Sequence, residues 1–123
     1  MKNAKPKILI VDDEKGFTKL TKLAMTEFEV LEENNATRAL ETARSFQPDL
    51  ILLDVVMPDM DGGDIAAQIK ADPALKTVPI VFLTAIVTEK ETAKRQSFGG
   101  YPFISKPVTP EKLAESIRKY LVA

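Results

Sequence analysis

Asp54 ends an apolar segment of the chain, a position that suggests a chemical role for its carboxylate. Residues 50–53 read Leu-Ile-Leu-Leu, which is typical of a strand buried on both faces. An ionised carboxylate at the end of such a strand is costly to bury unless a positive charge compensates it. The same carboxylate can act as a nucleophile that accepts a phosphoryl group. Asp54 is therefore the first candidate for a functional site.

Other polar residues follow the remaining apolar runs at equivalent positions. Asp12 and Asp13 come directly after the first run, Thr84 ends the fourth, and Lys106 follows the fifth. In a parallel sheet the carboxyl ends of the strands meet at one edge, where ligands bind. The sequence therefore predicts that these side chains gather around Asp54.

The chemistry of this set is consistent with phosphoryl transfer. Three carboxylates close together repel one another, and a hard cation such as Mg²⁺, which prefers oxygen ligands, relieves that repulsion. The chain has no His and no Cys, which disfavours zinc. Lys106 supplies a point cation and Thr84 a hydroxyl donor for a phosphoryl oxygen. Positioning and charge neutralisation are most of what phosphoryl transfer to Asp54 requires.

Short apolar runs alternate with longer segments that have helical spacing. The predicted strands are Lys7–Val11, Glu29–Glu32, Leu50–Asp54, Val78–Leu83 and Phe103–Ser105. The predicted helices are Glu14–Glu27, Asn34–Phe46, Asp64–Ala71, Thr88–Phe98 and one that begins at Thr109-Pro110. This alternation predicts an α/β fold with a doubly wound parallel sheet covered by helices on both faces. For the first helix, the evidence is that the apolar residues Phe17, Leu20, Ala24 and Phe28 fall near helical spacing.

Composition narrows the class of protein. A chain of 123 residues is one domain of ordinary size, and 45% hydrophobic with 28% charged residues is typical of a soluble globular protein. The net charge of -1 gives no electrostatic case for direct nucleic-acid or membrane binding. No apolar run is long enough to span a membrane. The chain has no cysteine and so no disulfides, and a cytoplasmic setting is the default expectation.

These residues, in this order, resemble the receiver domain of two-component response regulators over essentially the whole chain, residues 1–123. The pieces that carry the resemblance are Ile8–Glu14, Asp54 with Met57-Pro58 and Asp61-Gly62, Thr84-Ala85, and Lys106-Pro107. The resemblance implies a single receiver domain, similar to the chemotaxis regulators, with a (βα)5 flavodoxin-like fold and strand order 2-1-3-4-5.

The resemblance also implies a metal site. Asp13 and Asp54 would bind Mg²⁺ directly, together with the main-chain carbonyl of Val56, and Asp12 would act mainly through water. Asp54 would be the residue that is phosphorylated.

The same resemblance assigns catalytic and switch residues. Thr84 and Lys106 would contact the phosphoryl group on Asp54. Thr84 and Phe103 would form the switch, in which Thr84 moves toward the phosphoryl group and Phe103 turns inward. The protein would then catalyse only its own phosphorylation and dephosphorylation and would not be an enzyme in the ordinary sense.

Partners follow from the resemblance as well. The donor would be a phosphohistidine on a sensor histidine kinase or a histidine phosphotransfer protein. The output would be a downstream protein target or a fused output domain. The face formed by the helix at 88–98, the strand at 103–105 and the last helix would be the partner or homodimer surface.

Three other functions are compatible with parts of the pattern. A phosphatase acting on small phosphate esters would also form an aspartyl phosphate, but Val56 stands where such enzymes often place their acid. A nucleotide or flavin binder would need a Gly-rich first loop, and this one is acidic. A receiver-like interaction module that is never phosphorylated usually lacks one of the acids or the Lys, and all are present here.

Val56 and Ile86 predict the lifetime of the phosphorylated form. They lie two residues beyond Asp54 and Thr84, at positions that border the phosphoryl group in this family. Both are apolar, so neither can orient an attacking water by hydrogen bonding. We therefore predict a long-lived aspartyl phosphate. Val56→Asn and Ile86→Glu should each speed self-dephosphorylation, and equal rates in parent and variants would contradict this prediction.

Overall fold

The computed structural model describes residues 5–54, 62–84, 101–106 and 108–121 of the chain. In chain order the elements are β1 (Lys7–Val11), α1 (Lys15–Ala24), β2 (Glu29–Glu33), the 3₁₀ helix η1 (Ala36–Arg38), α2 (Ala39–Phe46), β3 (Leu50–Asp54), α3 (Gly62–Ala71), β4 (Ile80–Thr84), β5 (Phe103–Ser105) and α5 (Pro110–Leu121). The predicted helix at 88–98 lies outside the described residues. Within the described ranges, no helix is both long enough and apolar enough to cross a membrane.

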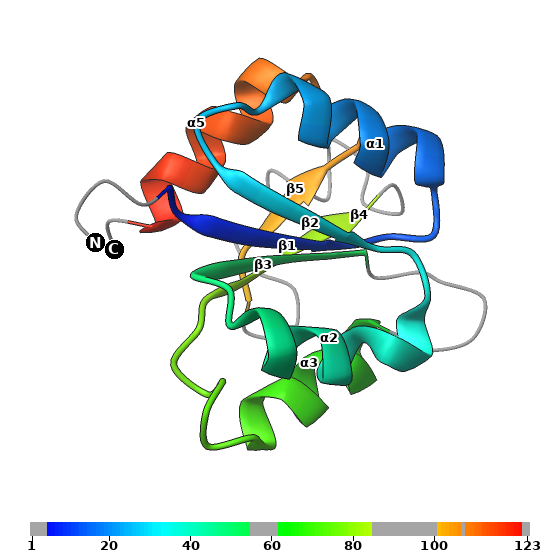
Figure 1. The fold of residues 1–123 in the computed structure, drawn as a ribbon, viewed down its shortest axis with the longest axis vertical. Coiled ribbons are helices and arrows are strands. Elements are labelled where there is room, and N and C mark those ends of the chain that lie inside the picture. Colours follow the sequence, from blue (N-terminus) through cyan, green and yellow to red (C-terminus); the bar gives the residue numbers. More distant parts are fainter. Residues whose placement is uncertain (1–4, 55–61, 85–100, 107, 122–123) are drawn as a thin grey trace.

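The five strands form one parallel sheet in the order β2-β1-β3-β4-β5. Figure 1 shows three layers, with α1 and α5 on one face of this sheet and α2 and α3 on the other. Parallel strands need crossover connections, which is why helices separate them along the chain. The predicted flavodoxin-like fold and strand order are confirmed.

Each face of the sheet carries its own core. Along β1, Leu9 and Val11 pack with the α2 and α3 side, whereas Ile8 and Ile10 pack with the side of α1 and α5. All four side chains are fully buried. Successive side chains of a strand point to opposite faces, so an unbroken aliphatic run is what a sheet covered on both sides requires.

The apolar residues that mark the first helical segment do not all face the core. Leu20 and Ala24 are exposed, and the buried residues of the helix are Thr18 and Thr21. Burial of these hydroxyls is possible because both are hydrogen-bonded. The Thr21 hydroxyl donates to the carbonyl of Phe17 one turn earlier at 2.7 Å, and Thr18 bonds outside the helix.

Several element boundaries also differ from the prediction. α1 ends at Ala24 rather than Glu27, β2 extends to Glu33, and α3 begins at Gly62 rather than Asp64. The segment predicted as one helix after β2 is divided into η1 and α2. Terminal turns depend on individual hydrogen bonds that sequence periodicity does not record.

The fourth strand begins at Ile80 rather than Val78, because the residues before it belong to a turn. The Val78 N–H donates to the carbonyl of Leu75 at 3.0 Å, and the Val78 carbonyl accepts from the Lys70 ammonium at 2.6 Å. Pro79 has no N–H to give to a ladder. The strand also extends one residue further than predicted, to Thr84.

Candidate functional site

Three aspartates meet at the carboxyl edge of the sheet. Asp12 follows β1 directly, Asp13 comes next, and Asp54 is the last residue of β3. One carboxylate oxygen from each lies within 4.8 Å of the others. Asp12 and Asp54 are buried, with exposed fractions of 0% and 6%, whereas Asp13 is exposed. The structure thus brings together the three acids that the sequence placed at this edge.

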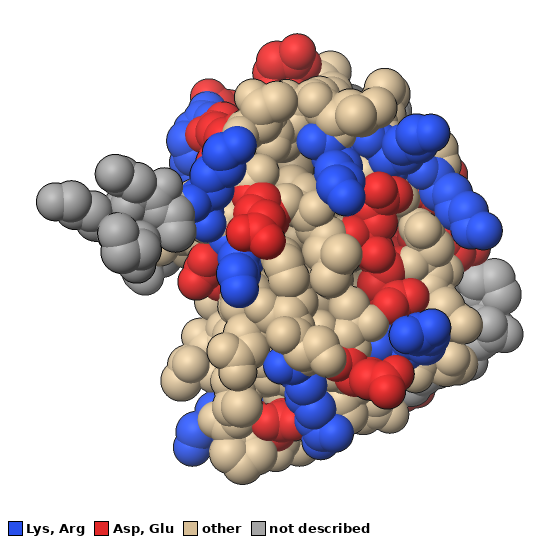
Figure 2. Space-filling model, viewed as in Figure 1, with Lys and Arg blue, Asp and Glu red and all other residues tan. Residues whose placement is uncertain are grey.

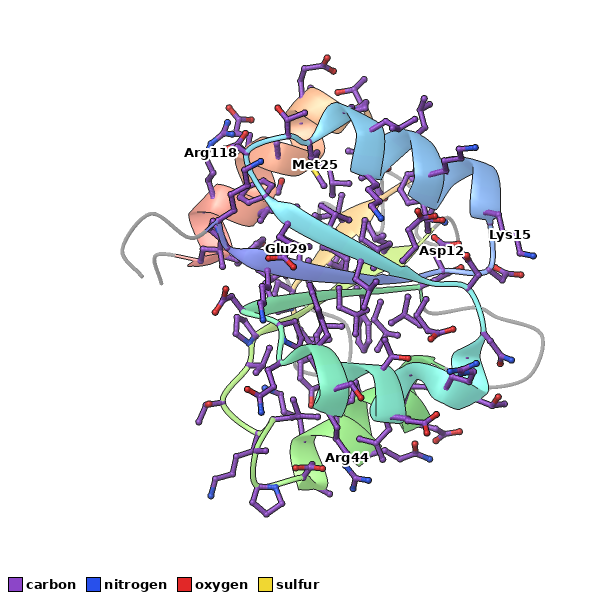
Figure 3. All side chains as sticks on the ribbon, viewed as in Figure 1. Asp12, Lys15, Met25, Glu29, Arg44 and Arg118 are labelled. Atoms are coloured by element: carbon purple, nitrogen blue, oxygen red, sulfur yellow. The ribbon has the colours of Figure 1, made fainter. Side chains whose placement is uncertain are left out.

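The first loop is shaped by Asp12 itself. Its N–H donates to the carbonyl of Glu33 at 3.1 Å, which continues the ladder between β1 and β2. Its Oδ1 accepts from the N–H of Glu14 at 2.9 Å, a local turn that leads into α1. Figure 3 shows Asp12 at the end of β1, close to the start of α1 at Lys15. The carboxylate of Asp12 therefore has its direction fixed by the backbone that follows it.

Lys106 reaches this edge from β5 and pairs most closely with Asp12. Its ammonium lies 2.5 Å from Asp12 Oδ2, 2.7 Å from Glu14 Oε1 and 3.9 Å from Asp54 Oδ2. The same ammonium stands 4.7 Å from the centre of the Phe17 ring. Glu14 and Phe17 were not among the predicted site residues. The sequence could have suggested them only by position, because Glu14 follows Asp13 directly and Phe17 lies in the first turn of α1.

The surroundings of Lys106 keep it charged. Burial alone lowers the pKa of the Lys106 ammonium, but hydrogen bonds to Asp12 and Glu14, together with the charges of Asp12 and Asp54, outweigh burial and raise the pKa above its ordinary value. The side chain is only 12% exposed, so its attraction to these carboxylates is weakly screened by water.

The donor set fits a hard divalent cation. The Lys106 ammonium pairs with the carboxylates of Asp12, Glu14 and Asp54. Asp13 adds a further carboxylate to the cluster, so among these side chains negative charge is in excess. The ligand atoms are all carboxylate oxygens, which Mg²⁺ prefers over nitrogen or sulfur. The exposed Asp13 leaves one side of the cluster open to water.

The remaining predicted residues are placed only in part. Thr84 ends β4 and pairs with Ser105 of β5, and Asp54 pairs with Leu83, so the Thr84 backbone lies at the same edge. Its side chain, and all of Val56 and Ile86, lie outside the described residues. Phe103 is half-buried and packs against the core on the α2 and α3 side.

Comparison with known proteins gives the family. The family model for the response regulator receiver domain matches residues 8–118. The chain belongs to the response regulator receiver family. Receiver domains are modules of two-component signalling rather than conventional enzymes, and they interact with histidine kinases or phosphotransfer proteins and with output targets.

Solved receiver structures share the fold closely. Chemotaxis protein CheY4 from Vibrio cholerae matches with a TM-score of 0.80 at 25% identity, covering 94% of this chain and 98% of that one. A response regulator from Desulfuromonas acetoxidans matches with a TM-score of 0.80 at 27% identity, covering 95% and 97%.

Similar sequences include receivers of two lengths. The polar-differentiation response regulator DivK from Brucella anthropi is 29% identical over 116 residues, which are 93% of this chain and 94% of DivK. The probable transcriptional regulator ycf27 from Pyropia yezoensis is 33% identical over 123 residues, which are 98% of this chain and 49% of that protein. The chain thus spans about half the length of the ycf27 relatives that it matches.

Proposed function

We propose that Asp54 accepts a phosphoryl group from a phosphohistidine protein in a Mg²⁺-dependent reaction, and that residues 1–123 act as one receiver domain. The observation that carries this proposal is the juxtaposition of three carboxylates within 4.8 Å of one another with the Lys106 ammonium. Membership of the receiver family supports the same chemistry.

Each residue of the site has a defined part in this proposal. Asp13, Asp54 and the Val56 carbonyl would hold Mg²⁺, with Asp12 acting through water. The bound cation would neutralise charge on the transferring phosphoryl group. A carboxylate oxygen of Asp54 attacks phosphorus, and the bond from phosphorus to the donor imidazole breaks. Lys106, whose ammonium lies 3.9 Å from Asp54 Oδ2, is close enough to shift toward the new phosphoryl oxygens.

Thr84 and Phe103 would transmit phosphorylation of Asp54 to the surface that binds a partner. Phosphorylation would draw the Thr84 hydroxyl toward the phosphoryl group and allow Phe103 to turn inward. The half-buried position of Phe103 against the core is compatible with such a movement. The surface around β5, α5 and residues 88–98 would then bind a target or a second copy of the chain.

Fluoroberyllate, which mimics a phosphoryl group on a carboxylate, tests the proposal. Added with Mg²⁺, it should change amide exchange at the carboxyl edge of the sheet in the parent protein and leave the Asp54→Asn variant unchanged. The same response in both proteins would contradict the assignment. Sustained release of phosphate from small phosphate esters would instead favour a phosphatase.

The outer face of α1 supports a contact with the phosphohistidine donor. Leu20 and Leu23 are 63% and 66% exposed, and they are the large apolar side chains that stand exposed in the described part of the chain. Three exposed lysines lie on the same helix, which has no acidic residue. Figure 2 shows basic atoms beside uncharged residues over α1, in the upper part of the view. A donor with an apolar, acidic surface would complement this helix.

A double substitution tests this contact. Leu20→Ala with Leu23→Ala should slow phosphoryl transfer from a phosphorylated histidine phosphotransfer domain by about tenfold or more, since buried apolar anchors dominate interface energies. Phosphorylation by acetyl phosphate, which needs no docking, should keep its parental rate. Lys119→Ala on α5 serves as the control. Equal slowing with both donors would mean that the substitutions disturb the site rather than the contact.

A further inference from the structure

A series of partly buried hydrogen bonds joins the carboxyl end of β2 to the aspartate loop. The Asn34 amide nitrogen, Nδ2, donates to the main-chain carbonyl of Asp12 at 2.7 Å and to the Thr18 hydroxyl at 3.0 Å. The Thr18 hydroxyl in turn donates to Glu32 Oε1 at 2.8 Å. Thr18 and Asp12 are both fully buried. These hydrogen bonds therefore connect the Glu32 carboxylate on β2, through Thr18 of α1, to the main chain of Asp12.

These bonds hold Asp12 from two sides. Its N–H is fixed by the Glu33 carbonyl at 3.1 Å, and its carbonyl is fixed by Asn34. With both main-chain groups of Asp12 held by adjacent residues of one segment, the peptide that leads into Asp13 has a defined direction. Asp13 is itself exposed and protrudes from this peptide.

The Thr18 hydroxyl can serve as donor and acceptor at once, as its bonds to Glu32 and Asn34 require. A hydroxyl carries one hydrogen and two acceptor sites, so Thr18 can accept from Asn34 while it donates to Glu32. An apolar residue of the same shape would leave one Nδ2 hydrogen of Asn34 without this acceptor. The amide would then be free to rotate away from Asp12. Thr18 can be buried on the inward face of α1 because its hydroxyl has these partners.

We propose that Asn34, oriented by the buried Thr18 hydroxyl, is a positioning residue for the cation site. It fixes the Asp12–Asp13 peptide so that the carboxylates of both residues face the space beside Asp54. The inference rests on the proposed function, since it concerns the Mg²⁺ that Asp54 would share. Neither Asn34 nor Thr18 touches the cation or the phosphoryl group.

Metal affinity tests the proposal directly. Thr18→Val and Asn34→Ala should each weaken Mg²⁺ binding, measured by titration calorimetry on the folded protein, by about tenfold or more, as expected for groups that orient metal ligands. Thr18→Ser keeps the hydroxyl and should retain the parental affinity. Mn²⁺ binding followed by electron paramagnetic resonance gives a second readout that does not depend on phosphorylation.

The chain offers a matched control for each variant. Thr21→Val removes a buried hydroxyl from the same helix, but that hydroxyl donates to the Phe17 carbonyl within the helix and is not part of the link to Asp12. Asn35→Ala removes the neighbouring amide, whose Oδ1 caps η1 by accepting from the Thr37 N–H at 3.0 Å. Both controls should lower the thermal midpoint while leaving the Mg²⁺ affinity unchanged.

The outcomes separate this inference from the proposed function. Parental protein that fails to bind Mg²⁺ would overturn both. Parental binding with Thr18→Val and Asn34→Ala within about twofold of it would overturn the positioning role alone. An equal loss of affinity in Thr21→Val and Thr18→Val would also overturn it, because the effect would then be one of general stability.

Discussion

Lys106→Met should lower the free energy of unfolding by about 3 kcal/mol in the absence of divalent cations, since it leaves a buried carboxylate without its partner. Asp12 is fully buried, and its Oδ2 lies 2.5 Å from the Lys106 ammonium. Methionine keeps most of the length of the side chain, so packing changes little and the loss reports on charge. Chemical denaturation in the presence of a chelator measures the effect.

The same variant should respond more strongly to Mg²⁺. A divalent cation would supply the positive charge that the ammonium provided, so Mg²⁺ should stabilise Lys106→Met by more than it stabilises the parent. Lys112→Met, at an exposed position of α5, is the control and should change neither quantity. An unfolding free energy that stays within about 0.5 kcal/mol of the parent would show that the ion pair does not compensate Asp12.

The contribution of Lys106 also has a predicted pH dependence. Because the folded state raises the pKa of Lys106, its stabilisation is present in full below the unfolded value of about 10.4 and is lost as the pH rises through the raised value. Above neutral pH, the stability curves of parent and Lys106→Met should therefore stay apart until the solution is strongly alkaline.

Asp54→Asn should have the opposite effect on stability and should remove the response to Mg²⁺. The substitution takes one charge from a cluster in which three carboxylates lie within 4.8 Å of one another. Without divalent cations the variant should be more stable than the parent by about 1 kcal/mol, because like charges no longer repel across a buried site. The stabilisation that Mg²⁺ gives the parent should be absent.

Asp49→Asn is the matched control for this result. Asp49 stands just before β3, at the opposite end of the same strand, and its Oδ2 accepts from the Lys7 N–H at 2.8 Å. Its loss should lower stability slightly and leave the Mg²⁺ response intact. A drop in stability for Asp54→Asn, with Mg²⁺ still stabilising it, would indicate that Asp54 is structural.

The fold was predictable because its strongest signals are local. The aliphatic runs at 8–11 and 50–53 are typical of short strands covered on both faces, and each is followed by a helical segment. The boundaries of β4 were not predictable, because they depend on how Val78 and Lys70 bond in the preceding turn. The hydrogen bonds of an individual turn leave no trace in periodicity.

The sequence predicted those site residues whose positions are determined by the ends of the strands. Strand order alone brings Asp12, Asp13 and Asp54 together. The pairing of Lys106 with Glu14 depends instead on side-chain reach across the edge, which position in the sequence does not encode. The burial of Thr18 in α1 was not predicted for the same reason, since its hydrogen-bond partners lie elsewhere in the chain.

Phosphoryl incorporation at Asp54 is the most direct test of the account. The protein is incubated with acetyl phosphate and Mg²⁺, its intact mass is measured, and the modified residue is located in peptides. We expect one added phosphoryl group, carried by Asp54, and none when Mg²⁺ is chelated or when Asp54 is replaced by Asn. Unmodified Asp54 under these conditions, or incorporation that persists in Asp54→Asn, would contradict the account.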